Sequence, residues 1–382
     1  MTNDQKVPLQ NTTRPAAERT STNANHSAAS KAEIRESSAA TGRATHATTH
    51  DVHVRLDDRV RLMSALLAAT DFPEKSQRRK PHGTHAHARA TRKLLADSAQ
   101  HPAVQTTQAL LDQSTPLEAL YTLALNISLP DVQLTTDAPA WMPLGYIEKV
   151  RDFYTTTGLA HFWHQERHLW EKAQIEAQHV FYGADFRRFL LPFLDRIDEQ
   201  FVFIPNISYP TDHELGVRHN GQLICIAPPP IAWGDNPPWP YDEESMRMHS
   251  YRAALAQFGR LVLTQYLHAS SANSEKLAEA AQVELPLNDQ FRATFPTWEE
   301  QFIELFVTAV VAMYLEQHMN DAEYKSFVLM ERKMRGINIL PGTVSVLRRY
   351  LQEKGGSKYS NLMEFLPYFP KQLRVAKRMV NI

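Results

Sequence analysis

Cysteine is almost absent from this chain of 382 residues, and that absence excludes two classes of protein. The single cysteine, Cys225, lies in the apolar run Leu223–Ile226, so the chain can form neither a disulfide framework nor a zinc site made of several cysteines. Because its sequence neighbours are apolar, we expect the Cys225 thiol to be buried and unreactive.

The chain also lacks an excess of charge of either sign. Its 41 Lys and Arg residues face 42 Asp and Glu residues, which gives a formal net charge of -1. No global field therefore draws the protein to nucleic acid or to an anionic membrane. We expect neither a nucleic-acid partner nor a membrane partner.

A targeting or membrane-spanning segment is missing as well. The first ten residues contain no apolar stretch of the kind that a secretory signal needs. No later segment approaches the ~20 apolar residues that span a bilayer. On these grounds we expect a cytoplasmic protein.

Common catalytic motifs are also absent. The sequence contains no GxSxG nucleophile elbow, no GxxxxGK[ST] phosphate loop and no GxGxxG turn. A Cys/His nucleophile pair is not expected, because the only cysteine is predicted to be buried. Glu243 and Glu244 stand together at the start of a predicted helix, where the helix dipole explains two carboxylates without catalysis.

Composition divides the chain into three predicted regions. Residues 1–49 have almost no large apolar side chain, which predicts a disordered tail. Residues 50–199 predict a mainly helical region that opens with a short strand at 52–56. Residues 200–382 predict a small sheet followed by helices, packed with the preceding region as one folded unit. The expected fold class is α+β and predominantly helical.

Local signals place the elements of the third region. Residues 201–210 predict a strand, and residues 214–229 predict a hairpin whose turn is Asn220-Gly221. A long helix is expected over about 244–268. A second helix is expected from Thr297, because Thr297 followed by Glu300 matches a capping box.

Two groups of histidines are candidate metal sites. His164 and His168 are four residues apart and would share one helix face, but Gln165 stands where a zinc peptidase needs glutamate. We therefore favour a solvated helix face for them. His82, His85 and His87 lie in a basic segment, for which we also favour a solvated structure over a metal or anion contact.

Three segments in sequence order resemble the bacterial DUF4932 family: HPAVQTTQALLDQSTPLEALYTLALNISLP, VRDFYTTTGLAHFWHQERHLWEKAQ and FVFIPNISYP. The resemblance covers most of residues 52–335. It implies a zincin-like fold, with a small antiparallel sheet next to a long central helix. In such a metallopeptidase the central helix carries an HExxH motif, and a later helix supplies an acidic third ligand.

The resemblance also implies that the metal-binding motif has degenerated. The best register places the family's HEFxH on the five residues Ala256, Gln257, Phe258, Gly259 and Arg260. None of these can act as a zinc ligand or as the general base, and Glu304, or as the less favoured alternative Glu300, would be the surviving third ligand. We predict that Arg260 pairs with Glu304 in place of the metal. A second register on Thr264–His268 keeps one histidine but puts Gln265 at the glutamate position.

The leading hypothesis is a catalytically inactive, metallopeptidase-like protein that binds a peptide or protein through a retained cleft, without a cofactor. The groove residues would be Tyr209, Trp233 and Trp239, although Pro-rich loops with tryptophan often only close a core. One alternative is an active zinc metallopeptidase or other metallohydrolase with unconventional ligands from His213, His249, His268 and Glu304. Another alternative is a helical protein-interaction module, which would be favoured if no sheet lay beside the helix at 251–267.

Overall fold

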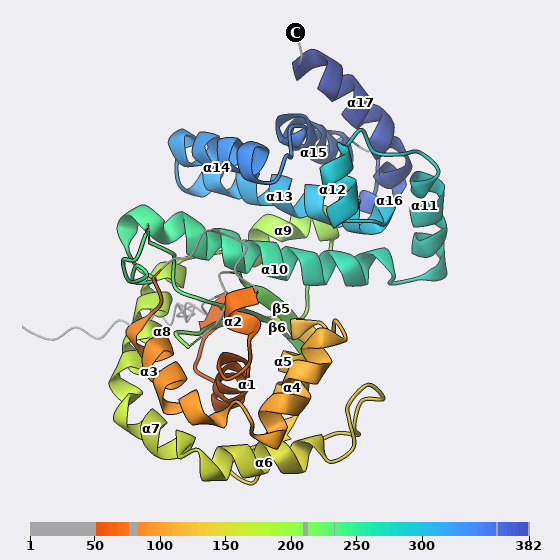
Figure 1. The fold of residues 1–382 in the computed structure, drawn as a ribbon. Helices are drawn as coiled ribbons and strands as arrows, with labels where there is room; N and C mark the ends of the chain where they lie inside the picture. Colours follow the sequence, from red (N-terminus) through yellow and green to blue (C-terminus); the bar gives the residue numbers. More distant parts are fainter. Residues whose placement is uncertain (1–50, 76–82, 209–212, 233, 357, 381–382) are drawn as a thin grey trace, which may run out of the picture. The chain divides into compact units, whose positions relative to one another are not determined.

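A computed structural model describes residues 51–75, 83–208, 213–232, 234–356 and 358–380 of the chain (Figure 1). The predicted tail at 1–49 lies outside the described residues. So do His82 and two of the predicted groove residues, Tyr209 and Trp233.

The described strands form a four-stranded sheet, in the order β1-β4-β6-β5, and a separate pair of β2 with β3. Their bounds are β1 Val52–Val54, β2 Ile127–Ser128, β3 Gln133–Leu134, β4 Gln200–Pro205, β5 Leu215–His219 and β6 Gln222–Ala227.

Helices make up most of the described residues, which confirms a predominantly helical chain with a small sheet. Their bounds are α1 Asp58–Ala68, α2 Phe72–Lys75, α3 Ala86–Leu94, α4 Pro102–Asp112, α5 Leu117–Leu125, α6 Tyr146–Thr156, α7 Leu159–Gln165, α8 Arg167–Phe181, α9 Phe186–Leu194, α10 Arg247–Leu267, α11 Ser271–Ala281, α12 Asp289–Thr294, α13 Trp298–His318, α14 Asp321–Met334, α15 Leu340–Gly355, α16 Leu362–Phe365 and α17 Phe369–Val380.

The prediction of an antiparallel sheet was wrong, because the four-stranded sheet is mixed. Strand β4 pairs in parallel with both β1 and β6, and only β5 and β6 are antiparallel. Strands β4 and β6 are buried on both faces, as is typical of parallel strands. The sequence showed the β5–β6 hairpin but carried no local signal that β4 pairs in parallel with β6, beyond β5, or with β1, across a long helical crossover.

The hairpin itself is confirmed at its predicted turn. Asn220 and Gly221 have φ values of 47° and 71°, as a two-residue type I′ turn requires. The register pairs His219 with Gln222 next to the turn and Leu215 with Ile226 at the far end. This turn leaves β5 at the edge of the described sheet.

Helices cover both faces of the four-stranded sheet. One face, which includes Phe201 and Cys225, packs against α8 and α10. The other face, which includes Val202 and Ile224, belongs to a core shared with α1 and α5. Cys225 is buried as predicted, and burial raises the pKa of its thiol well above the usual range.

Helix α10 lies between the sheet and α13 (Figure 1). It packs on β5 and β6 with one side and directly on α13 with another, so side chains fill the space between the two helices.

The predicted capping box of α13 is present, because the side chains of Thr297 and Glu300 each accept a hydrogen bond from the other residue's main-chain N–H. Helix α13 is also apolar. In the part of the chain that the structure describes, no helix is long and apolar enough to cross a membrane.

The contact between Phe258 of α10 and Phe201 of β4 is predicted to be central to this packing. The two rings stack with centroids 4.6 Å apart, and Phe258 is 0% exposed. Phe258→Ala should lower the free energy of unfolding by about 3–5 kcal/mol, because it removes buried area and leaves a cavity. Urea unfolding measures this free energy. The control is Ile175→Ala, at a side chain that is 51% exposed, which should change the free energy of unfolding by no more than about 0.5 kcal/mol. Equal effects of the two substitutions would contradict a central role for the contact between Phe258 and Phe201.

Candidate functional site

The ion pair predicted between Arg260 and Glu304 is present. Arg260 lies on α10 and donates from Nη2 to Oε2 of Glu304, on α13, at 2.7 Å. Its Nη1 donates to Oε1 of Gln257 at 2.8 Å. Ala256, one helical turn before Arg260, lies on the same face of α10 and is partly exposed.

A second arginine shares the carboxylate of Glu304. Arg335, directly after α14, donates from Nη2 to Oε1 of Glu304 and from Nη1 to Oε2 of Glu331 at 3.0 Å. The Oγ1 of Thr308 also donates to Oε1 of Glu304, at 3.3 Å. The side chain of Glu304 is 4% exposed, whereas those of Arg260 and Arg335 are each 36% exposed. The carboxylate is therefore enclosed, whereas the two arginine side chains are partly exposed.

The two buried glutamates respond differently to these arginines. Burial alone would raise the pKa of Glu304, but the charges of Arg335 and Arg260 outweigh it and hold the pKa at about 2. Burial raises the pKa of Glu331, which has only Arg335 in direct contact and is repelled by Glu304. Glu304 is thus an ionised carboxylate with both oxygens engaged.

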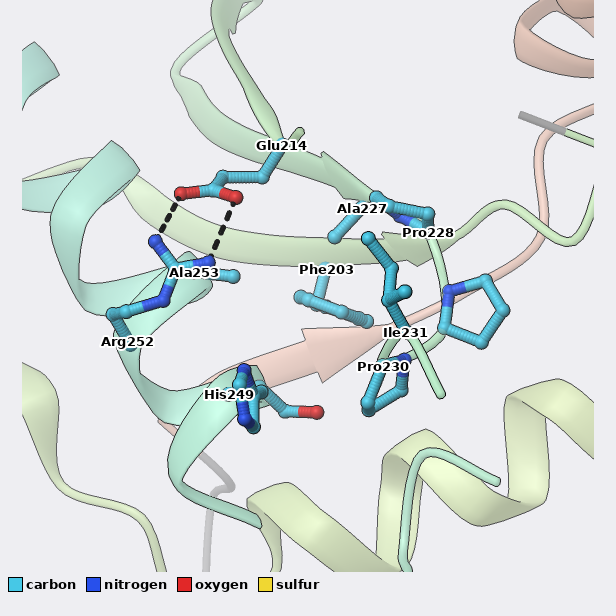
Figure 2. Close-up of a pocket in the computed structure, with 11 residues that line it drawn as sticks. Phe203, Glu214, Ala227, Pro228, Pro230, Ile231, His249, Arg252 and Ala253 are labelled. Carbon is cyan, nitrogen blue, oxygen red and sulfur yellow. Dashed lines mark hydrogen bonds and ion pairs between the residues drawn. The ribbon is translucent and has the colours of Figure 1, made fainter. Parts of the chain in front are cut away.

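A third ion pair extends this network to the edge strand. Glu214, directly before β5, accepts two hydrogen bonds from Arg252 of α10, at 2.9 and 3.1 Å (Figure 2). Burial would raise the pKa of Glu214, but the charge of Arg252 lowers it to about 2. The Nε2 of Gln257 also donates to the carbonyl oxygen of Glu214, at 3.4 Å. Gln257 therefore links the Glu214 pair to the Arg260 pair.

Strand β5 approaches α10 closely at Gly216. A Cβ atom at this position would lie 2.7 Å from Oε1 and 3.1 Å from Cβ of Gln257. Only glycine fits without displacing Gln257, so the edge strand and the Arg260 network are in direct contact through one residue.

A small pocket lies at the N-terminal end of α10, beside the carboxyl ends of β4 and β6 (Figure 2). Glu214 and Arg252 form one wall, Pro228–Ile231 forms the opposite wall, and His249 lies at its lower side. Its volume of about 30 Å³ is room for roughly one or two water molecules. Trp239, a predicted groove residue, is 39% exposed, and its main-chain N–H donates to the carbonyl of Pro230 in the pocket wall.

The residues at the predicted metal position do not fit a zinc ion. Ala256 has no ligand atom, and the guanidinium of Arg260 has only donors and a fixed positive charge. Glu304 directs both carboxylate oxygens at arginines. Within the described ranges, no three His, Cys, Asp or Glu side chains form a group that could hold a metal ion.

The unconventional ligands considered from the sequence do not come together. His249 lines the small pocket, while His268 follows the other end of α10 and contacts Oε1 of Glu299 at 2.8 Å. The second motif register, on Thr264–His268, does not place its residues at an enclosed site either, because Thr264 and Gln265 are exposed. His213 also joins no such group in the described chain.

The prediction of solvated histidines is confirmed for His164 and His168 and is wrong for His87. His164 and His168 are exposed as predicted, but they do not share a helix, because α7 ends at Gln165 and α8 begins at Arg167. The expectation of a solvated His87 was wrong, since this residue is 0% exposed. Trp170 Nε1 donates to its Nε2 at 3.0 Å, and burial lowers the pKa of His87 to about 3.

Sequence reasoning missed Arg335, Glu331, Arg252 and Glu214. Glu331 and Arg335 are four residues apart, which is the usual spacing of a surface ion pair and gives no sign of burial. Glu214 and Arg252 are separated by 38 positions, and no local pattern connects them. Only the tertiary arrangement brings these residues to the site.

No family model matches the chain, and no curated protein or solved structure matches it at a significant level. The resemblance to the DUF4932 family and the zincin-like fold therefore stay predictions.

Glu304→Gln is expected to destabilise the protein in a pH-dependent way. Near neutral pH the change leaves two guanidinium groups poorly paired and should cost about 3–5 kcal/mol. The folded pKa of about 2 lies below the ordinary 4.5, so the stabilisation by Glu304 is complete above about pH 4.5 and is lost as the pH falls toward 2. The difference from wild type in urea unfolding should therefore shrink from about pH 7 to pH 3.

A matched control for this prediction is Glu275→Gln, which removes an exposed carboxylate from α11. It should change the free energy of unfolding by no more than about 0.5 kcal/mol at any pH. A Glu304→Gln difference that stayed constant with pH would contradict a depressed pKa for Glu304.

Proposed function

We propose that this chain is a catalytically inactive, metallopeptidase-like protein that binds an extended peptide or protein segment. The observation that carries the proposal is the ion pair of Arg260 with Glu304, which brings together the two positions that the resemblance assigns to metal ligands. A guanidinium takes the role of the dication there, because it supplies positive charge to the same carboxylate.

Loss of peptidase chemistry follows from the side chains at these positions. Hydrolysis by a zinc peptidase needs a metal-bound water and a carboxylate that accepts its proton. Gln257 stands at the position of that carboxylate, and its amide cannot act as a base. Its Oε1 is already an acceptor for Arg260.

The edge strand supports a role in peptide binding. Because His219 and Gln222 flank a two-residue turn, the alternation along β5 directs the main-chain N–H and C=O of Gly216 and Arg218 away from β6. Gly216 is buried beneath Gln257, whereas Arg218 is partly exposed. An extended segment can add to such an edge through main-chain hydrogen bonds, which do not require a metal.

The two alternatives receive less support. The described residues offer no group of ligands for an unconventional metal site. A purely helical interaction module was expected to lack a sheet beside the helix at 251–267, but β5 and β6 pack on α10.

The assignment of the metal position can be tested by rebuilding it. Ala256→His together with Arg260→His would place two imidazoles four residues apart on α10, with Glu304 opposite as a third ligand. We expect about one zinc ion per chain in this double variant and none at stoichiometric level in the native protein. Inductively coupled plasma mass spectrometry of tag-free protein measures the metal content.

The single variant Ala256→His is the control, since one imidazole with Arg260 still in place should not retain zinc. A double variant that folds but takes up no zinc would count against the metallopeptidase-like assignment. Stoichiometric zinc in the native protein would overturn the proposal of an inactive protein.

Peptide binding at the edge strand is tested by selecting a random phage-displayed peptide library on the full chain. Selected peptides are resynthesised with N-methyl groups on alternate amides, which removes the donors on one side of an extended strand. If the peptide adds to the edge of β5, methylation of one set of alternate amides should lower the binding affinity about tenfold or more, and methylation of the other set should change it little. Equal effects of the two sets on affinity would contradict binding by strand addition at β5.

A further inference from the structure

Arg260 and Arg335 both keep a hydrogen-bond donor that the protein does not use. A guanidinium has five N–H donors, and the contacts of each arginine start from Nη1 and Nη2. Neither Nε atom has a partner in the described chain, and neither is among its buried unpartnered nitrogens. Both Nε–H groups therefore reach solvent.

Arg252 differs from these two arginines in this respect. Its Nε is also without a partner, but it is buried. Its two Nη groups each donate once to Glu214. The Nε–H of Arg252 is therefore not available to a ligand, unlike those of Arg260 and Arg335.

Ion pairing fixes these two guanidinium groups in place before any ligand arrives. Both are held by the same carboxylate, that of Glu304, and each is anchored at a second acceptor, Gln257 or Glu331. Preorganised donors lose little conformational entropy on binding.

We propose that Arg260 and Arg335 form an oxyanion site that receives a carboxylate of the bound segment. The inference rests on the proposed function and names the ligand chemistry at its centre. A carboxylate matches guanidinium N–H groups in geometry and charge, whereas a neutral carbonyl gains only one weaker hydrogen bond. The carboxylate is either a peptide C-terminus or an Asp or Glu side chain, and Ala256, on the same face of α10 as Arg260, is partly exposed.

The first test uses acetate as the probe and needs no peptide. Acetate is titrated into the ¹⁵N-labelled full chain at constant ionic strength, with chloride as the reference anion. We expect the Nε–Hε signals of Arg260 and Arg335 to shift with an affinity of about 10 mM, and that of Arg252 to stay unchanged. Shifts that chloride reproduces, or no shift at Arg260 and Arg335, would overturn the proposal.

The second test uses peptides selected on the full chain. Each is remade with an amidated C-terminus or with Asp and Glu replaced by Asn and Gln, which separates the two sources of the carboxylate. Removing the carboxylate that binds should lower the peptide's affinity about tenfold or more. Arg260→Lys or Arg335→Lys should have a similar effect, because lysine keeps the positive charge but lacks the planar set of guanidinium N–H donors. Thermal unfolding confirms that the lysine variants fold.

The matched control is Arg348→Lys, because Arg348 is 42% exposed and pairs with Glu316 in a separate contact. It should leave both acetate and peptide binding unchanged. Peptides that bind equally well without any carboxylate would overturn the oxyanion site and leave the proposed peptide binding intact. Acetate shifts at Arg260 and Arg335 without any selected peptide would support the site and contradict the peptide-binding function.

Discussion

The buried carboxylate of Glu304 is the interaction on which the arrangement around α10 depends. It lies on α13, where nearly all neighbouring side chains are apolar and buried, and it accepts from Arg260 beside the sheet and from Arg335 after α14. An ionised carboxylate at that depth is tolerated only when it is paired on both oxygens. The positions of α10 and of the end of α14 are therefore constrained by the need to bring a guanidinium to each oxygen.

A guanidinium in the place that the resemblance assigns to zinc keeps a positive charge there, although a smaller one, and changes the chemistry. Zinc accepts lone pairs, polarises a carbonyl and lowers the pKa of a bound water. A guanidinium only donates from N–H groups in one plane. In our proposal Arg260 therefore retains the capacity to recognise an oxygen of a ligand, while the capacity to break its bond is lost with the metal.

Local sequence signals predicted only the local parts of this structure. The Asn220-Gly221 turn and the Thr297 capping box depend on residues within a few positions, and both are present. The parallel pairs of β4 with β1 and with β6 join strands that do not follow one another in the sequence, so a visible hairpin led to the wrong prediction of an antiparallel sheet. Arg335 was missed for a related reason, since its spacing from Glu331 matches an ordinary surface pair and its contact with Glu304 depends on the packing of α13.

The edge strand and the arginines are coupled through Gln257. Its Nε2 donates to the carbonyl of Glu214, its Oε1 accepts from Arg260, and its side chain covers Gly216. The edge strand and the Arg260 ion pair therefore share one amide side chain, and a change in its position would alter the contacts of both together.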